Sequence, residues 1–175
     1  MMIARVTFLF FVAVTALSLG SAGSAHAQDR SDEILGSFRD WTAYRITRGD
    51  EVFCFATSGP KQSSPKNVKR SRIAFMVTIW PARSIAGEPS IEIGYPFRKS
   101  SKPTVTIKNR QFEMFVDNET AWLSDHSQEK ALIDEMKDNV TMVVKGISQR
   151  GTKTTDNFSL LGFSNALTKA EAACK

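Results

Sequence analysis

The sequence predicts a mainly β protein whose core is an antiparallel β-sandwich with one or two short helices. Eight or nine short segments with strand-like patterns follow one another, separated by turn residues. Only two segments have helical periodicity, and both lie late in the chain. Because no regular helices alternate with the strands, a parallel α/β sheet is disfavoured and a sandwich is favoured.

The first 27 residues have the pattern of a cleaved export signal. A short start that carries Arg5 precedes an apolar run over 6–19, and Ala25-His26-Ala27 matches the small-x-small cleavage pattern. The alternative is an uncleaved anchor, but the run is shorter than the roughly 20 residues that a spanning helix needs. We therefore expect residues 28–175 to form one exported domain with no membrane span.

The strand segments are predicted from alternation and turn chemistry. Arg48-Gly49-Asp50 separates segments 41–47 and 51–58, which predicts a hairpin. Residues 72–80 are the strongest strand and stop at Pro81. The polar segment 28–36 is expected to be a loose lead-in, and 59–70, 82–89 and 97–103 are expected to be loops. Further strands are expected at 91–95, 104–108, 111–116, 121–123, 140–147 and 157–161.

Two helices are expected near the C-terminus. Asp125 and Gln128 have the spacing of a capping box and precede an apolar stripe that ends at Met136. The second helix follows from apolar residues at helical spacing, namely Phe163, Ala166, Leu167, Ala170 and Cys174. This spacing places Cys174 on the side that faces the core.

The two cysteines predict a disulfide. An exported chain with an even number of cysteines is typically disulfide-bonded, and Cys54 with Cys174 is the one pairing available within this chain. Strand and helix faces also predict a set of buried residues: Trp41, Phe55, Phe75, Val77, Ile79, Ile93, Val143, Leu160, Phe163 and Leu167.

The charges are unevenly distributed. Residues 52–112 carry eleven Lys or Arg against two acids, whereas 113–138 carry eight acids against two Lys. The candidate binding patch consists of cations on two predicted loops, namely Lys61, Lys66, Lys69, Arg70 and Arg72 on the first and Arg98, Lys99 and Lys102 on the second. We expect these cations to be exposed and able to bind an anionic membrane, a polysaccharide or an acidic protein. The alternative is a solvated surface that only keeps the protein soluble.

Catalytic, metal and cofactor sites are not predicted. His126 lies between Asp125 and Ser127, but adjacent residues cannot form a catalytic triad. The acidic cluster of Asp134, Glu135 and Asp138 is typical of a solvated helix face. Recognisable hydrolase, metal-ligand and phosphate-loop motifs are missing, and no aromatic motif accompanies the cations to suggest nucleic acid.

The order of these pieces resembles the invasion-associated locus B family of exported bacterial proteins. The resemblance rests on the following segments: Phe38-Arg39-Asp40-Trp41, Cys54-Phe55-Ala56, the strand 73–80 with Pro81, Ala121-Trp122, Val143-Val144-Lys145-Gly146, Gly151-Thr152, Ser159-Leu160-Leu161-Gly162-Phe163, Ala166-Leu167 and Cys174. It covers the whole chain after the signal segment. Many family members have a cysteine shortly after the Asp-Trp pair, where this chain has Tyr44-Arg45.

The resemblance implies an immunoglobulin-like β-sandwich in the periplasm or on the outer surface of a bacterium, so that the protein is periplasmic or extracellular. Members from intracellular pathogens are associated with virulence through host-cell entry, and the family has no established enzymatic activity. We therefore expect a non-enzymatic envelope protein that binds an envelope or host-surface partner. The alternatives are a structural or stress-related periplasmic protein without a dedicated partner and an unrecognised hydrolase.

Overall fold

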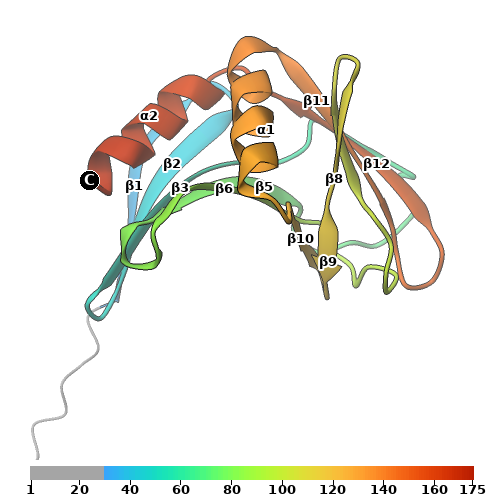
Figure 1. The fold of residues 1–175 in the computed structure, drawn as a ribbon. Helices are drawn as coiled ribbons and strands as arrows, with labels where there is room; N and C mark the ends of the chain where they lie inside the picture. The colour runs from blue at the N-terminus through green and yellow to red at the C-terminus, as the bar shows by residue number, and fades with distance from the viewer. Residues whose placement is uncertain (1–29) are drawn as a thin grey trace, which may run out of the picture.

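The computed structural model describes residues 30–175, which form two antiparallel sheets with two helices packed beside them (Figure 1). The predicted signal segment 1–27 lies outside the described residues. The arrangement confirms a mainly β, sandwich-like fold and is consistent with an immunoglobulin-like β-sandwich. Among residues 30–175, no helix is long and apolar enough to cross a membrane.

The larger sheet contains seven strands in the order β1-β2-β3-β5-β6-β10-β9. Their bounds are β1 Arg30–Phe38, β2 Trp41–Arg48, β3 Glu51–Ser58, β5 Ala74–Trp80, β6 Ile85–Glu92, β9 Phe115–Asp117 and β10 Thr120–Trp122. A short 3-10 helix, Pro81–Arg83, joins β5 to β6. The predicted hairpin on either side of Gly49 is confirmed, since β2 pairs with β3 from Thr42–Thr57 to Arg48–Glu51.

The smaller sheet contains five strands in the order β4-β12-β11-β7-β8. Their bounds are β4 Gln62–Ser64, β7 Thr104–Ile107, β8 Arg110–Glu113, β11 Thr141–Ile147 and β12 Lys153–Ser159. The strands β11 and β12 form a hairpin whose turn, residues 148–152, lies at the right-hand end of the molecule in Figure 1.

Three predicted loops are wrong in part. The lead-in is strand β1, which pairs with β2 at the sheet edge, where polar side chains are tolerated because one side faces solvent. The loop after Gly59 contributes the short edge strand β4. The loop before Ile91 is mostly strand β6, in which Pro89 lies opposite Val77.

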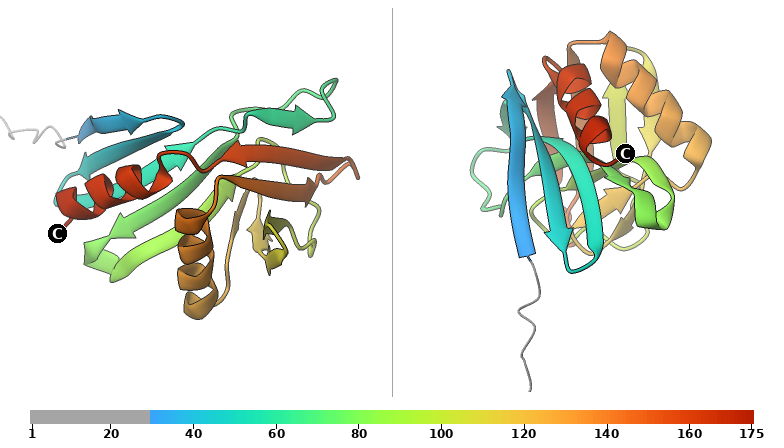
Figure 2. Two further views of the ribbon diagram at one scale, coloured as in Figure 1. Left: turned by 90° about the horizontal axis from the view of Figure 1, so that it is seen from above. Right: turned by 90° about the vertical axis from the view of Figure 1, so that its left-hand side faces the viewer.

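Both predicted helices are present. Helix α1 spans His126–Asp138, and the Asp125 side chain caps it by accepting a hydrogen bond from the backbone N–H of Ser127 at 2.8 Å. Helix α2 spans Phe163–Ala173 and packs against β2 and β3, as Figure 2 shows from two further directions. The residue before α2, position 162, has to be glycine, because an added Cβ there would lie 1.8 Å from the backbone oxygen of Phe38.

The core lies between the two sheets and beneath the two helices. Eight of the ten residues predicted to be buried are buried: Trp41, Phe75, Val77, Ile79, Ile93, Leu160, Phe163 and Leu167. The ring of Trp41 contacts those of Phe163 and Phe75 edge-on, with centroids 4.8 and 6.5 Å apart. This aromatic cluster joins α2 to the larger sheet.

Phe55 and Val143 are only half-buried, so these two predictions are wrong. Cys54 and Ala56 occupy the core side of β3, while Phe55 stacks on Tyr44 at 5.1 Å on the opposite side. In β11 the buried positions are Met142 and Val144. Both strands are apolar on their two faces, so alternation alone does not identify the inner face.

The predicted disulfide is confirmed. Cys54 on β3 is bonded to Cys174 at the end of α2, across 120 positions of sequence. Both sulfur-bearing side chains are buried, at 0% and 7% exposure. The bond therefore fastens the C-terminal helix to the centre of the larger sheet.

Candidate functional site

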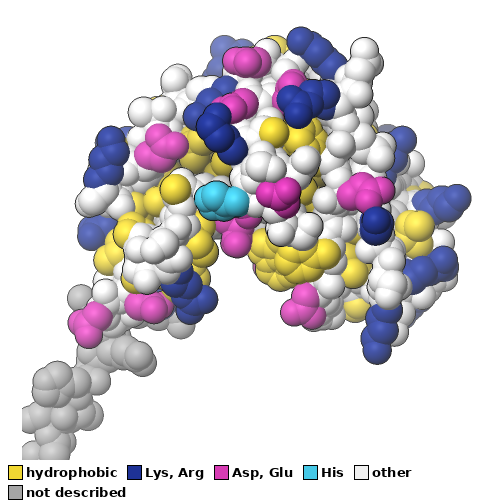
Figure 3. Space-filling view, in the orientation of Figure 1, with side chains coloured by type: hydrophobic (Ala, Val, Ile, Leu, Met, Phe, Trp, Pro, Cys, Tyr) yellow, Lys and Arg dark blue, Asp and Glu magenta, His cyan; other side chains and the backbone are white. Residues whose placement is uncertain are grey.

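The candidate site is a polar cleft of 610 Å³ between the ends of the two sheets. We call it the basic cleft and define it by its lining residues, which are Asn67, Val68, Lys69, Arg70, Ser71, Gly94, Tyr95, Pro96, Glu119, Ser148, Gln149, Arg150, Thr152 and Thr154. These residues come from the segment before β5, the segment after β6, the β9–β10 turn and the β11–β12 hairpin. In Figure 3, Lys and Arg side chains gather at this right-hand end of the molecule.

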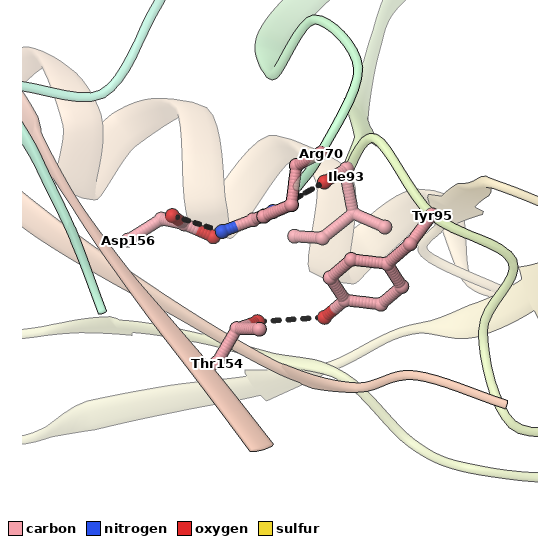
Figure 4. Close-up of polar contacts among 5 residues, drawn as sticks. All are labelled: Arg70, Ile93, Tyr95, Thr154 and Asp156. Carbon is pink, nitrogen blue, oxygen red and sulfur yellow. Dashed lines mark hydrogen bonds and ion pairs between the residues drawn. The ribbon is translucent and has the colours of Figure 1, made fainter. Parts of the chain in front are cut away.

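Arg70 lines the cleft and belongs to a buried ion pair. The Arg70 guanidinium donates to both Asp156 carboxylate oxygens, at 2.7 and 2.8 Å, and also donates to the carbonyl oxygen of Ile93 (Figure 4). The Arg70 side chain is 6% exposed and the Asp156 side chain is 0% exposed. Arg70 therefore joins its loop to β12 and to the end of β6, and the prediction that it is an exposed binding cation is wrong.

Tyr95 lies next to this pair. Its hydroxyl shares a 2.6 Å hydrogen bond with the hydroxyl of Thr154, and the Arg70 guanidinium lies 5.0 Å from the centre of its ring. Burial raises the pKa of the Tyr95 phenol, although the Thr154 hydrogen bond and the Arg70 charge act in the opposite direction. Tyr95 thus stays a neutral wall of the cleft at physiological pH.

Two glycines make this close packing possible. At Gly94, with φ +78°, an added Cβ would lie 2.7 Å from the backbone oxygen of Ser71. At Gly146, an added Cβ would lie 2.7 Å from the Tyr95 hydroxyl and 2.9 Å from the Phe97 ring. The first glycine lets the two cleft-lining segments approach each other, and the second makes room for Tyr95.

Two exposed cations line the cleft, and a third lies against the turn that carries one of them. Lys69 and Arg150 line it from opposite segments. The third is Arg98, whose guanidinium lies 2.8 Å from the position that a Cβ on Gly151 would take, so Arg98 lies against the turn that carries Arg150. Its backbone N–H also donates to the carbonyl oxygen of Ile147 at 2.9 Å. Within residues 30–175, none of these three cations forms an ion pair.

The two basic loops therefore meet only in part. Lys66 lines a neighbouring 640 Å³ cleft on the other side of its loop, and that cleft shares Arg70 and Ser71 with the basic cleft. Arg98 brings the second loop against the turn that carries Arg150, and Lys99 is an exposed residue next to it.

The other predicted cations lie elsewhere. Lys61 is ion-paired with Asp40. The hydrogen bond that the Lys61 ammonium donates to the Asp40 carboxylate is the main reason that the pKa of Asp40 is lowered. Lys102 pairs with Glu113 at 2.8 Å, which raises the pKa of Lys102. Arg72 lines a different cleft, on the β2–β3 part of the larger sheet.

Arg150 was not among the predicted binding residues. The sequence of 148–155 is typical of a polar turn, whereas the predicted patch consists of cations on two loops that each carry several. A hairpin pattern places such a turn at one end of the sandwich, where loops carry binding residues, so the cation Arg150 beside Gly151 is the signal in the sequence.

The residues considered for catalysis or metal binding do not form such a site in the described part of the chain. His126 is 79% exposed on its side chain and pairs with Glu129 at 2.6 Å, one turn along α1. Asp134 pairs with Lys130 at 2.7 Å, which lowers the pKa of Asp134, and Glu135 pairs with Arg110 at 2.9 Å. Among residues 30–175, no three His, Cys, Asp or Glu side chains are grouped as metal ligands.

Comparison with known proteins adds no family assignment. No protein-family model matches the chain, and no curated protein or solved structure matches it.

Proposed function

We propose that this chain is an exported, non-enzymatic binding protein of the bacterial envelope, and that the basic cleft holds an anionic envelope or host-surface component. The observation that carries the proposal is that Lys69 and Arg150 line one cleft and that Arg98 lies against the turn that carries Arg150. These cations come from three separate segments at this end of the molecule and have no ion-pair partner among residues 30–175.

Bringing like charges together has an electrostatic cost. Exposed charges interact over about 8 Å at physiological ionic strength, so neighbouring cations on one rim repel each other unless a counter-charge is bound. A concave surface with charges of one sign also attracts and concentrates anions. An anionic ligand would remove the repulsion, and this favours binding over a merely solvated surface.

The base of the cleft is rigid enough to support such a site. Arg70 and Asp156 satisfy each other's charges below the rim, and Arg70 also holds the end of β6 through the Ile93 carbonyl. Binding residues on loops are effective when a scaffold fixes the loop positions. The buried pair thus positions Lys69 without adding net charge to the cleft.

Location in the envelope is proposed on two grounds. A structural disulfide between buried cysteines is typical of oxidising compartments such as the periplasm or the cell surface. The resemblance to the invasion-associated locus B family implies the same location, and we propose that the chain is a protein of this type.

The test is co-sedimentation of the protein, produced without residues 1–27, with bacterial envelope membranes across a salt series. The triple variant Lys69→Gln, Arg98→Gln, Arg150→Gln removes the rim charges and leaves Arg70 in place. We expect the parent to bind at low salt, to dissociate as salt rises, and to bind more strongly than the triple variant. Equal binding by the two proteins would refute the proposed cleft.

A further inference from the structure

We infer that the basic cleft takes an acidic sugar: a hydroxyl-rich ring that carries one carboxylate or phosphate monoester, rather than a polyanion or a lipid chain. This inference rests on the proposed anion-binding function and specifies its ligand. The observation behind it is an acid in the same cleft as the cations. Glu119 lines the basic cleft together with Lys69 and Arg150, yet among residues 30–175 it forms no ion pair with either.

Glu119 is held in place by the backbone. Its carbonyl oxygen accepts a 3.0 Å hydrogen bond from the N–H of Ile93, and the preceding Asn118 carbonyl accepts one from Phe97 at 2.8 Å. The Glu119 carboxylate accepts a hydrogen bond from the Ser71 hydroxyl at 3.3 Å. The carboxylate therefore belongs to the cleft wall and keeps capacity for further hydrogen-bond donors.

A cleft with separate cations and a carboxylate suits a ligand that has both a negative group and hydroxyl donors. The anionic group would lie against Lys69 and Arg150, and ring hydroxyls would donate to Glu119. A polyanion has no donors for Glu119 and would be repelled by it. Arg70 is already neutralised by Asp156, so it adds no attraction for a second or third negative charge.

The rest of the lining is also suited to a sugar. Amide and hydroxyl side chains line the cleft between the charged residues, namely Asn67, Ser71, Ser148, Gln149 and Thr152. Tyr95 and Pro96 add a small apolar surface against which the carbon face of a sugar ring could pack. Such neutral polar groups fix orientation through hydrogen bonds, whereas a lipid chain would leave them unpaired.

The volume fits a small ligand. At 610 Å³ the cleft is within the range of about 300–1,000 Å³ typical of small-molecule sites. An extended polymer would occupy it with one or two units and leave along the open rim. Free acidic oligosaccharides and the acidic head groups of glycolipids both present this chemistry.

The experiment is an NMR chemical-shift titration of the protein lacking residues 1–27 with four probes. Galacturonic acid, galactose 6-phosphate and galactose share the ring and differ in the group at one carbon, and inorganic tripolyphosphate is the polyanion. We expect an acidic sugar to bind at least about tenfold more tightly than galactose, which is the usual effect of one charge-assisted hydrogen bond. Which of the two acidic sugars binds more tightly identifies the anionic group.

The variant Glu119→Gln separates the two ligand classes. It should weaken binding of the acidic sugar, because a charged acceptor for hydroxyls is lost, and should strengthen binding of tripolyphosphate, because a repulsive charge is lost. Asp117→Asn, an equal charge change on an exposed residue outside the cleft lining, is the matched control and should leave sugar binding unchanged.

Two results would overturn the inference. Equal affinity for galactose and both acidic sugars would show that the anionic group is not recognised. Binding of tripolyphosphate without binding of either acidic sugar would show that the cleft takes polyanions. In either case salt-dependent envelope binding would still stand, whereas loss of envelope binding itself would refute the proposed function.

Discussion

Replacing Arg70 with methionine should destabilise the protein far more than an ordinary surface substitution. Methionine keeps an unbranched apolar side chain but removes the two hydrogen bonds to Asp156 and those to the Ile93 carbonyl. It leaves the fully buried Asp156 carboxylate without its partner. Breaking a buried pair in this way typically costs about 3–5 kcal/mol, so we expect that loss in the free energy of unfolding.

Urea-induced unfolding followed by circular dichroism measures this loss. The matched control is Arg72→Met, because Arg72 is two residues further on and exposed, and surface changes usually stay within about ±0.5 kcal/mol. The double variant Arg70→Met, Asp156→Leu should recover much of the stability, since the unpaired charge is then removed as well. A loss below about 1 kcal/mol for Arg70→Met would refute the role of the pair as a buried connection.

Three further predictions concern stability. Mass spectrometry after alkylation without reduction should find no free thiol, and two alkylated cysteines would contradict the Cys54–Cys174 bond. Removal of this bond should lower the free energy of unfolding by up to about 4–5 kcal/mol, because the unfolded chain then gains conformational entropy. Phe75→Ala should lower the free energy of unfolding by about 3–5 kcal/mol, because Phe75 is fully buried. Phe55→Ala should cost clearly less, because Phe55 is only half-buried. Equal losses in urea unfolding would show that the inner faces of β3 and β5 are wrongly assigned. Burial, and secondarily the neighbouring Glu129 carboxylate on α1, raises the pKa of Glu88 above its ordinary value of 4.5. Between the two pKa values the folded protein therefore keeps a proton that the unfolded chain has lost. The free energy of unfolding consequently falls as pH rises through the folded pKa. Glu88→Gln should therefore stabilise the protein more at pH 7 than near pH 4.5, and a pH-independent effect would contradict the shift.

The sequence predicts the fold well where local patterns and tertiary packing agree. The hairpin around Gly49, the strand before Pro81 and both helices follow from turn residues, β-branched runs and helical spacing. Strand β1 is missed because its polar sequence reveals no apolar face, and an edge strand is formed mainly by pairing with its neighbour. The prediction that Phe55 is buried is wrong because the core side of β3 carries the small residues Cys54 and Ala56, against which α2 packs closely.

The candidate site is predicted less completely. Lys69 and Arg98 are identified from basic loops; in the structure Lys69 lines the cleft and Arg98 lies against the turn that carries Arg150. The sequence does not show that Arg70 points inward, because its partner Asp156 lies 86 positions away on another strand. It also gives no reason to link Glu119 to this region, since that turn is brought beside the cleft by the pairing of β10 with β6. Long-range pairings of this kind are not encoded in local patterns.

We propose that this protein binds anionic envelope material through one cleft and not through its overall positive charge. The most direct measurement compares two variants with the same net charge in co-sedimentation with envelope membranes at low salt. One removes the rim cations by Lys69→Gln, Arg98→Gln and Arg150→Gln, and the other removes exposed cations elsewhere by Lys108→Gln, Lys137→Gln and Lys169→Gln. We predict that the first variant loses most of the binding while the second binds like the parent. Equal losses in the two variants would show that only net charge matters, and would contradict the claim.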